Sequence, residues 1–361
     1  MYIFNWFEVE NREGVSVIIC CYNSALRLPE TLRHIYNQKV PEQIGWEIIV
    51  VDNNSTDNTS DVAMSEWRRY NNNIPFKVVH QEIQGLSFAR SKGFENANYD
   101  ILIFCDDDNW LRDDYIRYAF EIMQSNESIG ILGGVSSGYF EVGKPFWFDA
   151  FMESYAVGKQ MYETGIANSR TYLAGAAVVV RKAIYQKLNF LSYSLLLTGR
   201  IGKRLTSGED TELCWLAMFL GFNLYYDERL RFVHFMPKQR LNWKYCVSMI
   251  AYGHSIPRIY FSLYHYLHNN IFNNREVSFD ITYKTLMRRH LNYLRKHNPN
   301  LKSILNAVRS LFISTEGSEK EIQFKSDIHK LRYLLFNKSD LEKNFYAITS
   351  LMQKIKQQNV S

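Results

Sequence analysis

The first 110 residues alternate between short apolar runs and helix-like segments, and this alternation constrains the fold more than any other feature. Runs rich in β-branched residues occupy 15–21, 46–52, 76–80 and 100–106. Between them lie segments with helical spacing of apolar residues or with helix-capping residues, at 28–38, 55–70 and 86–97. Strands joined by crossover helices predict a parallel sheet with right-handed connections. We therefore predict an α/β fold.

The ends of these apolar runs are where a ligand is expected. In open parallel sheets, ligands bind beyond the carboxyl ends of the strands. Polar residues and a glycine gather at those positions, namely Tyr22 and Asn23, Asp52 to Asn54, His80 to Gly85, and Asp106 to Asn109. These four groups are the first candidates for a binding site.

Beyond residue 110 the pattern is mixed and then helical. Strands are expected within 130–134 and 171–185, a helix at 208–222, and a strand or paired strands at 223–235. From residue 244 onward the pattern is helical, with breaks at Pro257, at 268–274 and at Pro299. We predict one domain at 1–245, followed by a helical basic region at 246–361.

Charge is unevenly distributed along the chain. Residues 281–361 hold 15 Lys and Arg against six Asp and Glu, a net charge of +9. The whole chain carries +5, which leaves −4 for residues 1–280. A basic tail predicts an anionic partner, either a membrane surface or a phosphate-bearing substrate. The alternative is a solvated helical surface without a partner. The sequence contains no recognisable nucleic-acid-binding module, so we expect no nucleic-acid partner.

Cysteine usage and hydropathy bear on location. The cysteines lack the spacing of a zinc site and lie mostly in apolar runs, at Cys20, Cys21, Cys105, Cys214 and Cys246. Buried reduced thiols predict a cytosolic protein. The first 14 residues lack the basic start and apolar stretch of a signal peptide. The sequence also has no run of 18 apolar residues, so no simple membrane-spanning helix is expected.

Three consecutive aspartates, Asp106 to Asp108, follow the fourth apolar run. Adjacent carboxylates repel each other, and a divalent cation removes that cost. Mg²⁺ and Mn²⁺ prefer oxygen ligands, and phosphate oxygens commonly complete their coordination shell. If Asp108 or Asn109 capped a helix near residue 111, that role would explain only one of the three acids. We therefore predict a Mg²⁺ or Mn²⁺ site here.

Six segments occur in order along the chain, namely VSVIICCYNSALRLPETL, EIIVVDNNSTDNT, QGLSFARSKG, ILIFCDDDNWL, YLAGAAVVVRKAIY and GEDTEL. Together they resemble the family 2 inverting nucleotide-sugar glycosyltransferases of the GT-A fold. ILIFCDDDNWL is similar to the Asp-X-Asp segment of that family, and GEDTEL to its Glu-Asp base motif. The resemblance spans residues 15–260 and implies a Rossmann-like, mostly parallel sheet flanked by helices, with a helical C-terminal extension.

The resemblance implies a uridine site at the first two strand ends. Tyr22 and Asn23 would line the base pocket, and Asn54 belongs to the same nucleotide-sugar site. Asp52 would accept a hydrogen bond from the base, and an acceptor carboxylate suits an imide N–H, which favours uracil over a purine. The alternative for Asp52 is an Asx-turn that closes the segment 52–55.

Further donor-site residues follow from the same resemblance. Arg90 would lie near the base or the diphosphate, where a guanidinium matches pairs of oxygen atoms; the alternative is a surface helix charge. Gly85 would let the backbone approach the donor, or would serve only as a turn. Asp107 belongs to the same site, and Gly175 and Ala176 would form the wall beside the donor sugar.

The implied metal ligands are Asp108, Asp106 and His234. Asp108 would bind the ion directly, whereas Asp106 would bind the ribose or metal-linked water. The ion would bridge the diphosphate and stabilise the leaving nucleoside diphosphate. His234, at the end of a predicted strand, would be a further ligand. The equally weighted alternative is a strand-end histidine satisfied by hydrogen bonds.

The implied catalytic residues are Asp210 and Glu209. Inversion at the anomeric carbon requires a base that takes the proton of the attacking acceptor hydroxyl. Asp210 would be that base, and Glu209 would orient the acceptor or Asp210. Negative charge is also favourable at a helix N-terminus. The alternative is therefore that Glu209 and Asp210 stabilise the helix and have no catalytic role.

The chain departs from the family pattern in two places. Processive members carry Gln-X-X-Arg-Trp, but QRLNW at 239–243 has Asn242 in place of the arginine. Without membrane spans after it, this departure predicts the addition of a single sugar. Cys20 and Cys21 replace the usual Pro-Thr-like pair near the base pocket. Residues 270–361 match no known pattern; they predict peripheral contact with an anionic membrane or, equally, a dimerisation arm.

The expected function is inverting, divalent-metal-dependent transfer of one sugar from a UDP-sugar to a saccharide or lipid-linked acceptor. We expect it to act in surface polysaccharide or glycolipid synthesis, in the cytoplasm or on the inner face of the membrane. One alternative is a catalytically silent nucleotide-sugar-binding module, which the intact GED segment opposes. Another is a sugar-phosphate nucleotidyltransferase, which needs a Gly-rich loop after the first strand; CCYNSALRLPE has no glycine.

Overall fold

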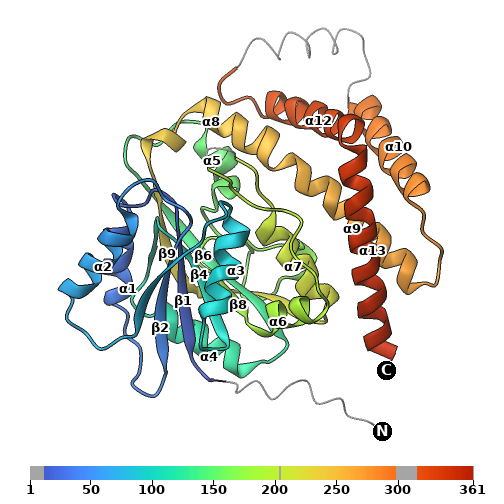
Figure 1. Ribbon diagram of the computed structural model, residues 1–361. Coiled ribbons are helices and arrows are strands. Elements are labelled where there is room, and N and C mark those ends of the chain that lie inside the picture. Colours follow the sequence, from blue (N-terminus) through green and yellow to red (C-terminus); the bar gives the residue numbers. More distant parts are fainter. Residues whose placement is uncertain (1–11, 203–204, 298–314, 361) are drawn as a thin grey trace. The chain divides into compact units, whose positions relative to one another are not determined.

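The computed structural model describes residues 12–202, 205–297 and 315–360 (Figure 1). The chain forms two compact units. Unit 1 comprises Met1–Tyr139, Tyr155–Lys187 and Leu213–Met236, and unit 2 comprises Phe140–Ser154, Leu188–Glu212 and Pro237–Ser361. The domain boundary predicted after residue 245 stays a prediction.

Unit 1 is built on a nine-stranded mixed sheet with the strand order β3-β2-β1-β4-β8-β6-β9-β5, to which β7 adds by pairing with β9. The strands are β1 Val15–Cys21, β2 Trp46–Asp52, β3 Phe76–His80, β4 Ile101–Asp106, β5 Asn109–Leu111, β6 Ile129–Phe140, β7 Gly165–Ile166, β8 Val178–Arg181 and β9 Asn223–Met236. The pairs β1–β2, β2–β3 and β1–β4 are parallel, whereas β4–β8, β6–β8 and β5–β9 are antiparallel. The four predicted N-terminal strands are confirmed.

Helices cover both faces of this sheet (Figure 1). They are α1 Leu28–Tyr36, α2 Thr59–Arg69, α3 Leu86–Asn96, α4 Tyr115–Ser125, α6 Ala183–Phe190 and α7 Glu209–Phe219. From β1 to β3 the chain adds strands toward one edge of the sheet, and after β3 it crosses back to place β4 on the other side of β1. Right-handed crossovers therefore put α1 and α2 on one face and α3 on the other.

The core of unit 1 explains why its central strands are apolar throughout. Val17 and Ile19 of β1 are buried in one cluster with Leu32 of α1. On the opposite face of the sheet, Ile18 packs against Gly93 of α3. A Cβ atom at position 93 would lie 2.3 Å from Cγ2 of Ile18. Strands that are covered on both faces read as continuous apolar runs.

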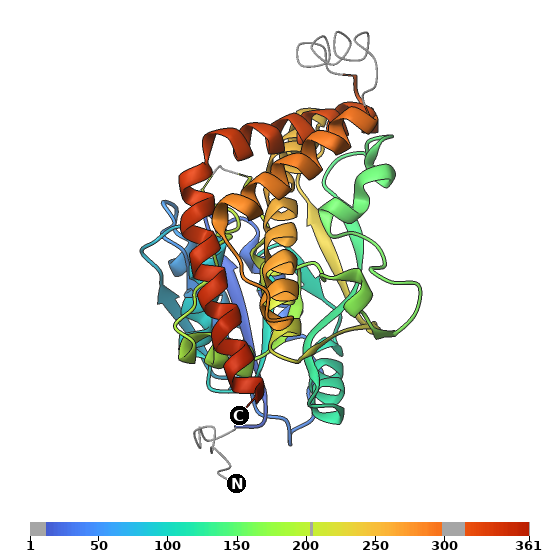
Figure 2. The ribbon, with the colours of Figure 1, turned by 90° about the vertical axis from the view of Figure 1, so that its right-hand side faces the viewer.

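Unit 2 is mainly helical (Figure 2). Its helices include α5 Phe148–Phe151, α8 Trp243–Val247, a π-helix Ser248–Gly253, α9 Ser255–Phe272, α10 Phe279–His297, α12 Glu319–Phe336 and α13 Lys338–Val360. The helical C-terminal extension is thereby confirmed. Among the described helices, none is both long and apolar enough to span a membrane.

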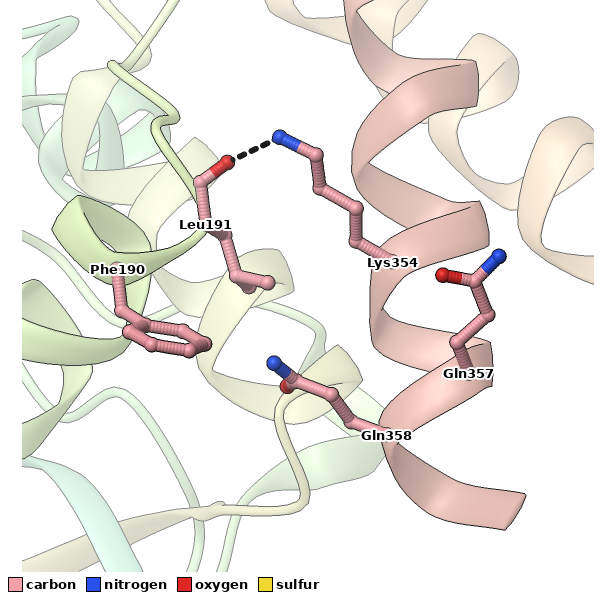
Figure 3. A pocket seen from close by; sticks show the side chains of 5 residues that line it. All are labelled: Phe190, Leu191, Lys354, Gln357 and Gln358. Carbon is pink, nitrogen blue, oxygen red and sulfur yellow. Dashed lines mark hydrogen bonds between the residues drawn. The ribbon is translucent and has the colours of Figure 1, made fainter. Parts of the chain in front are cut away.

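Unit 2 has a shallow pocket near the C-terminal end of α13 (Figure 3). Its lining residues are Phe190, Leu191, Lys354, Gln357 and Gln358. Nζ of Lys354 donates a hydrogen bond to the carbonyl oxygen of Leu191, with 2.7 Å between the two atoms. None of the five lining residues belongs to the predicted site.

Candidate active site

The carboxyl ends of β1, β2 and β4 meet at one edge of the sheet. Cys21 pairs with Asp52 across β1 and β2, and Cys20 pairs with Asp106 across β1 and β4. Because neighbouring strands lie about 4.8 Å apart, these pairings gather the groups that follow each strand. The sheet thus brings together the strand-end positions that the sequence selected at 22–23, 52–54 and 106–109.

The three aspartates occupy the end of β4 and the turn before β5. The helix that follows begins only at Tyr115, and its N-terminal flanking residue is Asp114. Asn109 instead starts β5, and its Oδ1 accepts a hydrogen bond from the backbone N–H of Asp106 at 3.2 Å. The alternative in which Asp108 or Asn109 caps a helix near residue 111 is therefore wrong.

Asp108 faces His234, and both side chains are almost fully buried. Oδ1 of Asp108 lies 3.4 Å from Nε2 of His234. The backbone sets this approach, because Asn109 of β5 pairs directly with His234 of β9 and the N–H of Phe235 donates to the carbonyl oxygen of Asp108 at 2.9 Å. Nδ2 of Asn109 also donates to Oδ1 of Asp108 at 3.2 Å.

Asp107 points to the segment between β1 and α1. Its Oδ2 accepts a hydrogen bond from the hydroxyl of Ser24 and pairs with the guanidinium of Arg27 at 2.6 Å. The hydroxyl of Thr31 donates to its carbonyl oxygen at 2.8 Å. Burial raises the pKa of Asp107, and the negative charge of Asp108 raises it further. The charge of Arg27 lowers the same pKa, so Arg27 and Asp108 have opposite effects on the ionisation of Asp107.

Asp106 lies in the field of several charged groups. Burial raises its pKa to about 6, while the charge of Arg90 counteracts this effect and that of Asp108 adds to it. The imidazole of His234 also lowers the pKa of Asp106. Asp106, Asp108 and His234 thus lie close enough to one another for their charges to interact.

Asp52 is held by the turn that follows β2. Its Oδ1 accepts the backbone N–H of Ser55 at 2.9 Å, and its Oδ2 accepts the hydroxyl of Ser60 at 2.5 Å. Burial raises the pKa of Asp52, but these hydrogen bonds outweigh it and leave the pKa below its ordinary value. A carboxylate oxygen has two acceptor sites, so the turn leaves acceptor capacity for a base.

Two asparagines near Asp52 have left-handed backbone conformations, Asn23 with φ 50° and Asn54 with φ 60°. The N–H of Asn23 donates to Oγ of Ser55 at 3.0 Å, and Nδ2 of Asn54 donates to the carbonyl oxygen of Glu82 at 3.0 Å. Tyr22 directly follows β1, and its N–H donates to Oγ of Ser24 at 3.0 Å. These bonds tie the ends of β1 and β2 into one framework.

Arg90 is buried inside the sheet's helix layer and is not a surface charge. Its guanidinium donates to the carbonyl oxygen of Gly175 at 3.1 Å and lies 5.4 Å from the ring centroid of Phe104. Ala176 follows in the same buried segment, two residues before the start of β8 at Val178. The surface-charge alternative for Arg90 is therefore wrong, and Arg90 helps to hold the segment predicted beside the donor sugar.

Gly85 starts α3 with φ 146°, a conformation that side chains disfavour. Its N–H donates to Oδ1 of Asn53 at 2.7 Å. Asn53, just after β2, also donates to the carbonyl oxygen of Ile83 at 2.7 Å. Gly85 thus forms a turn that is bonded to the end of β2.

The donor set at Asp108 suits a hard divalent cation. Neighbouring ligands of such an ion lie about 3 Å apart, because its metal–ligand distances are about 2.1 Å. The 3.4 Å separation between Asp108 and His234 is close to that value. Among the described residues, no three His, Cys, Asp or Glu side chains are arranged as a metal cage. Asp108 and His234 are the side chains that would hold such an ion.

Glu209 and Asp210 begin α7 and belong to unit 2. Oδ1 of Asp210 accepts the N–H of Thr211 at 2.7 Å. Burial lowers the pKa of His254 to about 4, although the charge of Asp210 acts in the opposite direction. Asp210 therefore has a neutral imidazole as a neighbour, and its predicted role as base stays a prediction.

Sequence reasoning missed two residues that organise these sites. Arg27 occupies the N-cap position of α1, where a positive charge is unfavourable. An arginine at such a position indicates an acidic partner elsewhere in the fold. Glu212 is fully buried and accepts the N–H groups of Leu196 at 3.0 Å and Leu197 at 2.7 Å, and the hydroxyl of Tyr264. Its position in α7 gave no such signal.

Residues 16–188 match the family model described as glycosyl transferase family 2. This segment of the chain belongs to glycosyltransferase family 2. The match covers β1 to β8 and includes Asp52, Arg90 and the three aspartates. The predicted family is thereby confirmed.

Curated relatives of this family 2 protein span more than it does. The poly-beta-1,6-N-acetyl-D-glucosamine synthase of Staphylococcus epidermidis is 22% identical over 247 residues, which are 65% of this chain and 55% of the relative. Glycosyltransferase GlyA of Streptococcus pneumoniae is 24% identical over 185 residues, 49% of this chain and 26% of GlyA. The chain thus spans about half of the first relative and a quarter of the second.

The fold is similar to that of a solved structure. TarS 1-349 of S. aureus, crystallised in complex with UDP-GlcNAc, has a TM-score of 0.51 and 17% identity. The similarity covers 96% of this chain and 92% of that chain. With the mixed sheet and its flanking helices, it confirms the predicted GT-A fold.

Proposed function

We propose that this family 2 protein transfers a single sugar from a UDP-sugar to a hydroxyl of a saccharide or lipid-linked acceptor, with inversion and with the help of Mg²⁺ or Mn²⁺. The observation that carries the proposal is the buried pair of Asp108 and His234 at the carboxyl end of the sheet, beside Asp106. Surface polysaccharide or glycolipid synthesis is the proposed setting.

The acidic residues divide the binding of the donor between them. Asp108 and His234 hold the cation, and Asp106 binds the ribose or a metal-linked water. When bound, the cation stabilises the leaving diphosphate as a Lewis acid. Arg27 keeps the carboxylate of Asp107 paired, so that one negative charge beside the diphosphate is neutralised by the protein itself.

The nucleotide base lies at the ends of β1 and β2. Asp52 accepts the imide N–H of uracil, because each of its oxygens retains an acceptor site. Tyr22, Asn23 and Asn54 surround the base, while Gly175 and Ala176 border the donor sugar. The names of the S. epidermidis relative and of the TarS complex make UDP-GlcNAc the first donor to test.

Asp210 is the proposed base, and Glu209 orients the acceptor or Asp210. A displacement with inversion forms the new bond from the acceptor oxygen to the anomeric carbon as the bond to the diphosphate breaks. Asp210 takes the proton of the acceptor hydroxyl in this step. Burial lowers the pKa of the nearby His254 to about 4, so that near neutral pH this imidazole adds no positive charge beside Asp210.

Addition of one sugar is favoured over polymerisation by the role of Asn242. Its Oδ1 accepts the N–H of Tyr245 at 3.0 Å and caps α8. The position that holds arginine in processive members therefore performs a helix-capping task here. Peripheral contact between the basic C-terminal region and an anionic membrane, at the inner face in the cytoplasm, belongs to the same proposal.

Release of UDP from UDP-GlcNAc tests this function. The chain would be incubated with Mn²⁺, UDP-GlcNAc and a panel of saccharide and lipid-linked acceptors, with other UDP-sugars and GDP-mannose alongside. Acceptor-dependent UDP release, with a β-linked product by NMR, is the expected result. Tight donor binding without transfer to any acceptor would instead favour the silent binding module.

A further inference from the structure

Two arginines of unit 2, Arg200 and Arg258, form no ion pair with an acid among the residues that the structure describes. Arg200 is half-buried, and one N–H of its guanidinium contacts the sulfur of Met249, with 4.0 Å between nitrogen and sulfur. Arg258 is exposed on α9. A guanidinium without an acidic partner favours an anion as its ligand. The location of the two arginines therefore decides which anion they can bind.

A hydrogen bond brings Arg200 close to the segment that begins α7. The hydroxyl of Thr206 donates to the carbonyl oxygen of Gly199, and Gly199 directly precedes Arg200. Thr206 lies four residues before Asp210, the proposed base. Arg200 is therefore held beside the start of the segment that carries Asp210.

The same segment packs against the π-helix and the first turn of α9. The hydroxyl of Ser207 donates to the carbonyl oxygen of Gly253, the last residue of the π-helix, at 3.0 Å. A Cβ atom on Gly208 would lie 2.5 Å from Cγ of Pro257 in α9. Arg258 directly follows Pro257, so α9 brings Arg258 to the start of α7 as well.

His254 lies in the field of all three charged groups. Its N–H donates to the carbonyl oxygen of Met249 at 3.0 Å, the residue that Arg200 contacts. Burial lowers the pKa of His254, and the charge of Asp210 acts in the opposite direction. The positive charges of Arg200 and Arg258 lower the same pKa further. The proposed base and both arginines thus lie near one imidazole, in agreement with the contacts of the backbone.

A phosphate suits two guanidinium groups better than a neutral sugar or a carboxylate does. A neutral hydroxyl gains less from a full positive charge, because hydrogen bonds between ionised partners are the stronger ones. A carboxylate has two oxygen atoms, and one guanidinium can bind both of them. A phosphate presents more oxygen atoms and can therefore be shared by two arginines.

We propose that Arg200 and Arg258 bind a phosphate group of the acceptor, close to the hydroxyl that Asp210 deprotonates. The inference rests on the proposed function, because the role of Asp210 as base identifies this part of unit 2 as the acceptor side. It narrows the acceptor to molecules that carry a phosphate near the reacting hydroxyl. Such a phosphate belongs either to a lipid-linked saccharide or to a soluble polyol phosphate.

Calorimetric binding of matched acceptor pairs to the full chain tests the phosphate site and its source. One pair, a glycerol phosphate trimer and triglycerol, represents soluble polyol phosphates. The other pair, dodecyl-diphosphate-linked N-acetylglucosamine and dodecyl N-acetylglucosaminide, represents lipid-linked acceptors. UDP and Mg²⁺ are present to occupy the proposed donor site. In one of the pairs, the phosphate-bearing member should bind at least 10-fold more tightly, and that pair identifies the source of the phosphate.

Three double variants assign this preference to the two arginines. Arg200→Gln, Arg258→Gln should reduce it to less than threefold, because the charged hydrogen-bond donors are removed. Arg200→Lys, Arg258→Lys keeps the charges and should recover part of it. The control Arg288→Gln, Arg289→Gln removes two charges from exposed positions of α10 and should leave it unchanged. Circular dichroism and urea unfolding would verify that each variant folds.

Equal binding of both members of each pair to the wild type, or the same loss of preference in both Gln variants, would overturn the proposal. Weaker UDP binding in Arg200→Gln, Arg258→Gln would also overturn it, since the arginines would then hold the diphosphate of the donor. Release of UDP from UDP-GlcNAc is a separate measurement. No release with any acceptor would contradict the proposed function, whereas equal release with both members of each pair would contradict only the phosphate site.

Discussion

Nε2 of His234 lies 3.4 Å from Oδ1 of Asp108, although Asp108 is in the turn before β5 and His234 is on β9. Their approach follows from the antiparallel pairing of β5 with β9, in which His234 is opposite Asn109. The position of this pair is thus set by backbone hydrogen bonds rather than by flexible side chains. A site with this rigidity would be ready for the proposed cation before the proposed donor binds.

Loss of the imidazole should weaken the use of metal. In His234→Ala, we expect the Mn²⁺ concentration that gives half-maximal UDP binding to rise about 10- to 100-fold, because one protein ligand is removed. His297→Ala removes an exposed histidine at the end of α10 and is the matched control. An unchanged Mn²⁺ requirement in His234→Ala would support the alternative of a purely structural strand-end histidine.

Substitution of the proposed base should affect chemistry rather than donor binding. We expect Asp210→Asn to lower kcat about 10²- to 10⁴-fold and to leave the Kd for UDP within twofold. Glu209→Gln should have a smaller effect on kcat and a larger one on the acceptor KM. Asp61→Asn, which removes a first-turn acid from α2, controls for loss of helix N-terminal charge. Equal kcat values for Asp210→Asn and Asp61→Asn would contradict the assignment.

The ion pair of Arg27 with Asp107 should stabilise the fold measurably. The side chain of Asp107 is 10% exposed and that of Arg27 is 31% exposed, so the pair lies between a buried and a surface ion pair. We expect Arg27→Ala to lower the free energy of unfolding by about 2 kcal/mol. Arg69→Ala breaks a 2.5 Å pair with Glu66 in which the arginine is 71% exposed.

Urea unfolding of the two arginine variants gives the comparison. The change for Arg69→Ala should be below about 1 kcal/mol, since exposed pairs contribute little. If both variants lost the same stability, the buried carboxylate of Asp107 would not depend on Arg27.

Glu212 should make stability depend on pH. Burial raises its pKa from the ordinary 4.5 to about 7, so the folded state holds a proton that the unfolded state has lost between those values. Its stabilising contribution is therefore full below pH 4.5 and is lost as the pH rises through 7. The groups facing it are the phenols of Tyr193, Tyr260 and Tyr264.

The variant Glu212→Gln isolates this effect. We expect the stability difference, wild type minus variant, to fall by about 3 kcal/mol between pH 4.5 and pH 8, as measured by urea unfolding at several pH values. Titrations shared by both proteins cancel in the difference. A difference that is independent of pH would mean that folding does not raise the pKa of Glu212.

Much of unit 1 was predictable because its signals are local. The runs at 15–21, 46–52 and 76–80 became β1, β2 and β3 with the same bounds. β1 and β2 are buried almost throughout, and burial on both faces makes such strands continuously apolar. The strand within 171–185 is shorter than the apolar pattern, and only Val178–Arg181 pairs in the sheet. Helix α6 follows it at once, because periodicity alone does not separate buried strands from buried helices.

Other features depend on contacts distant in sequence and were not predictable. Nothing local to Asp107 indicates that Ser24 and Arg27 are its partners. Likewise, the burial of Arg90 beside Gly175 arises only when α3 packs on the sheet. The acids at 106–108 were predictable as a cluster, whereas their separate partners required the fold.

The central claim is that a divalent cation couples UDP to Asp108. Isothermal titration calorimetry with UDP, with and without Mn²⁺, tests it most directly. The proteins compared are the wild type, Asp108→Asn and, as a control in the turn before α2, Asp57→Asn. The account predicts UDP binding that requires Mn²⁺, is lost in Asp108→Asn and is retained in Asp57→Asn. UDP binding that is independent of Mn²⁺, or equal in wild type and Asp108→Asn, would contradict it.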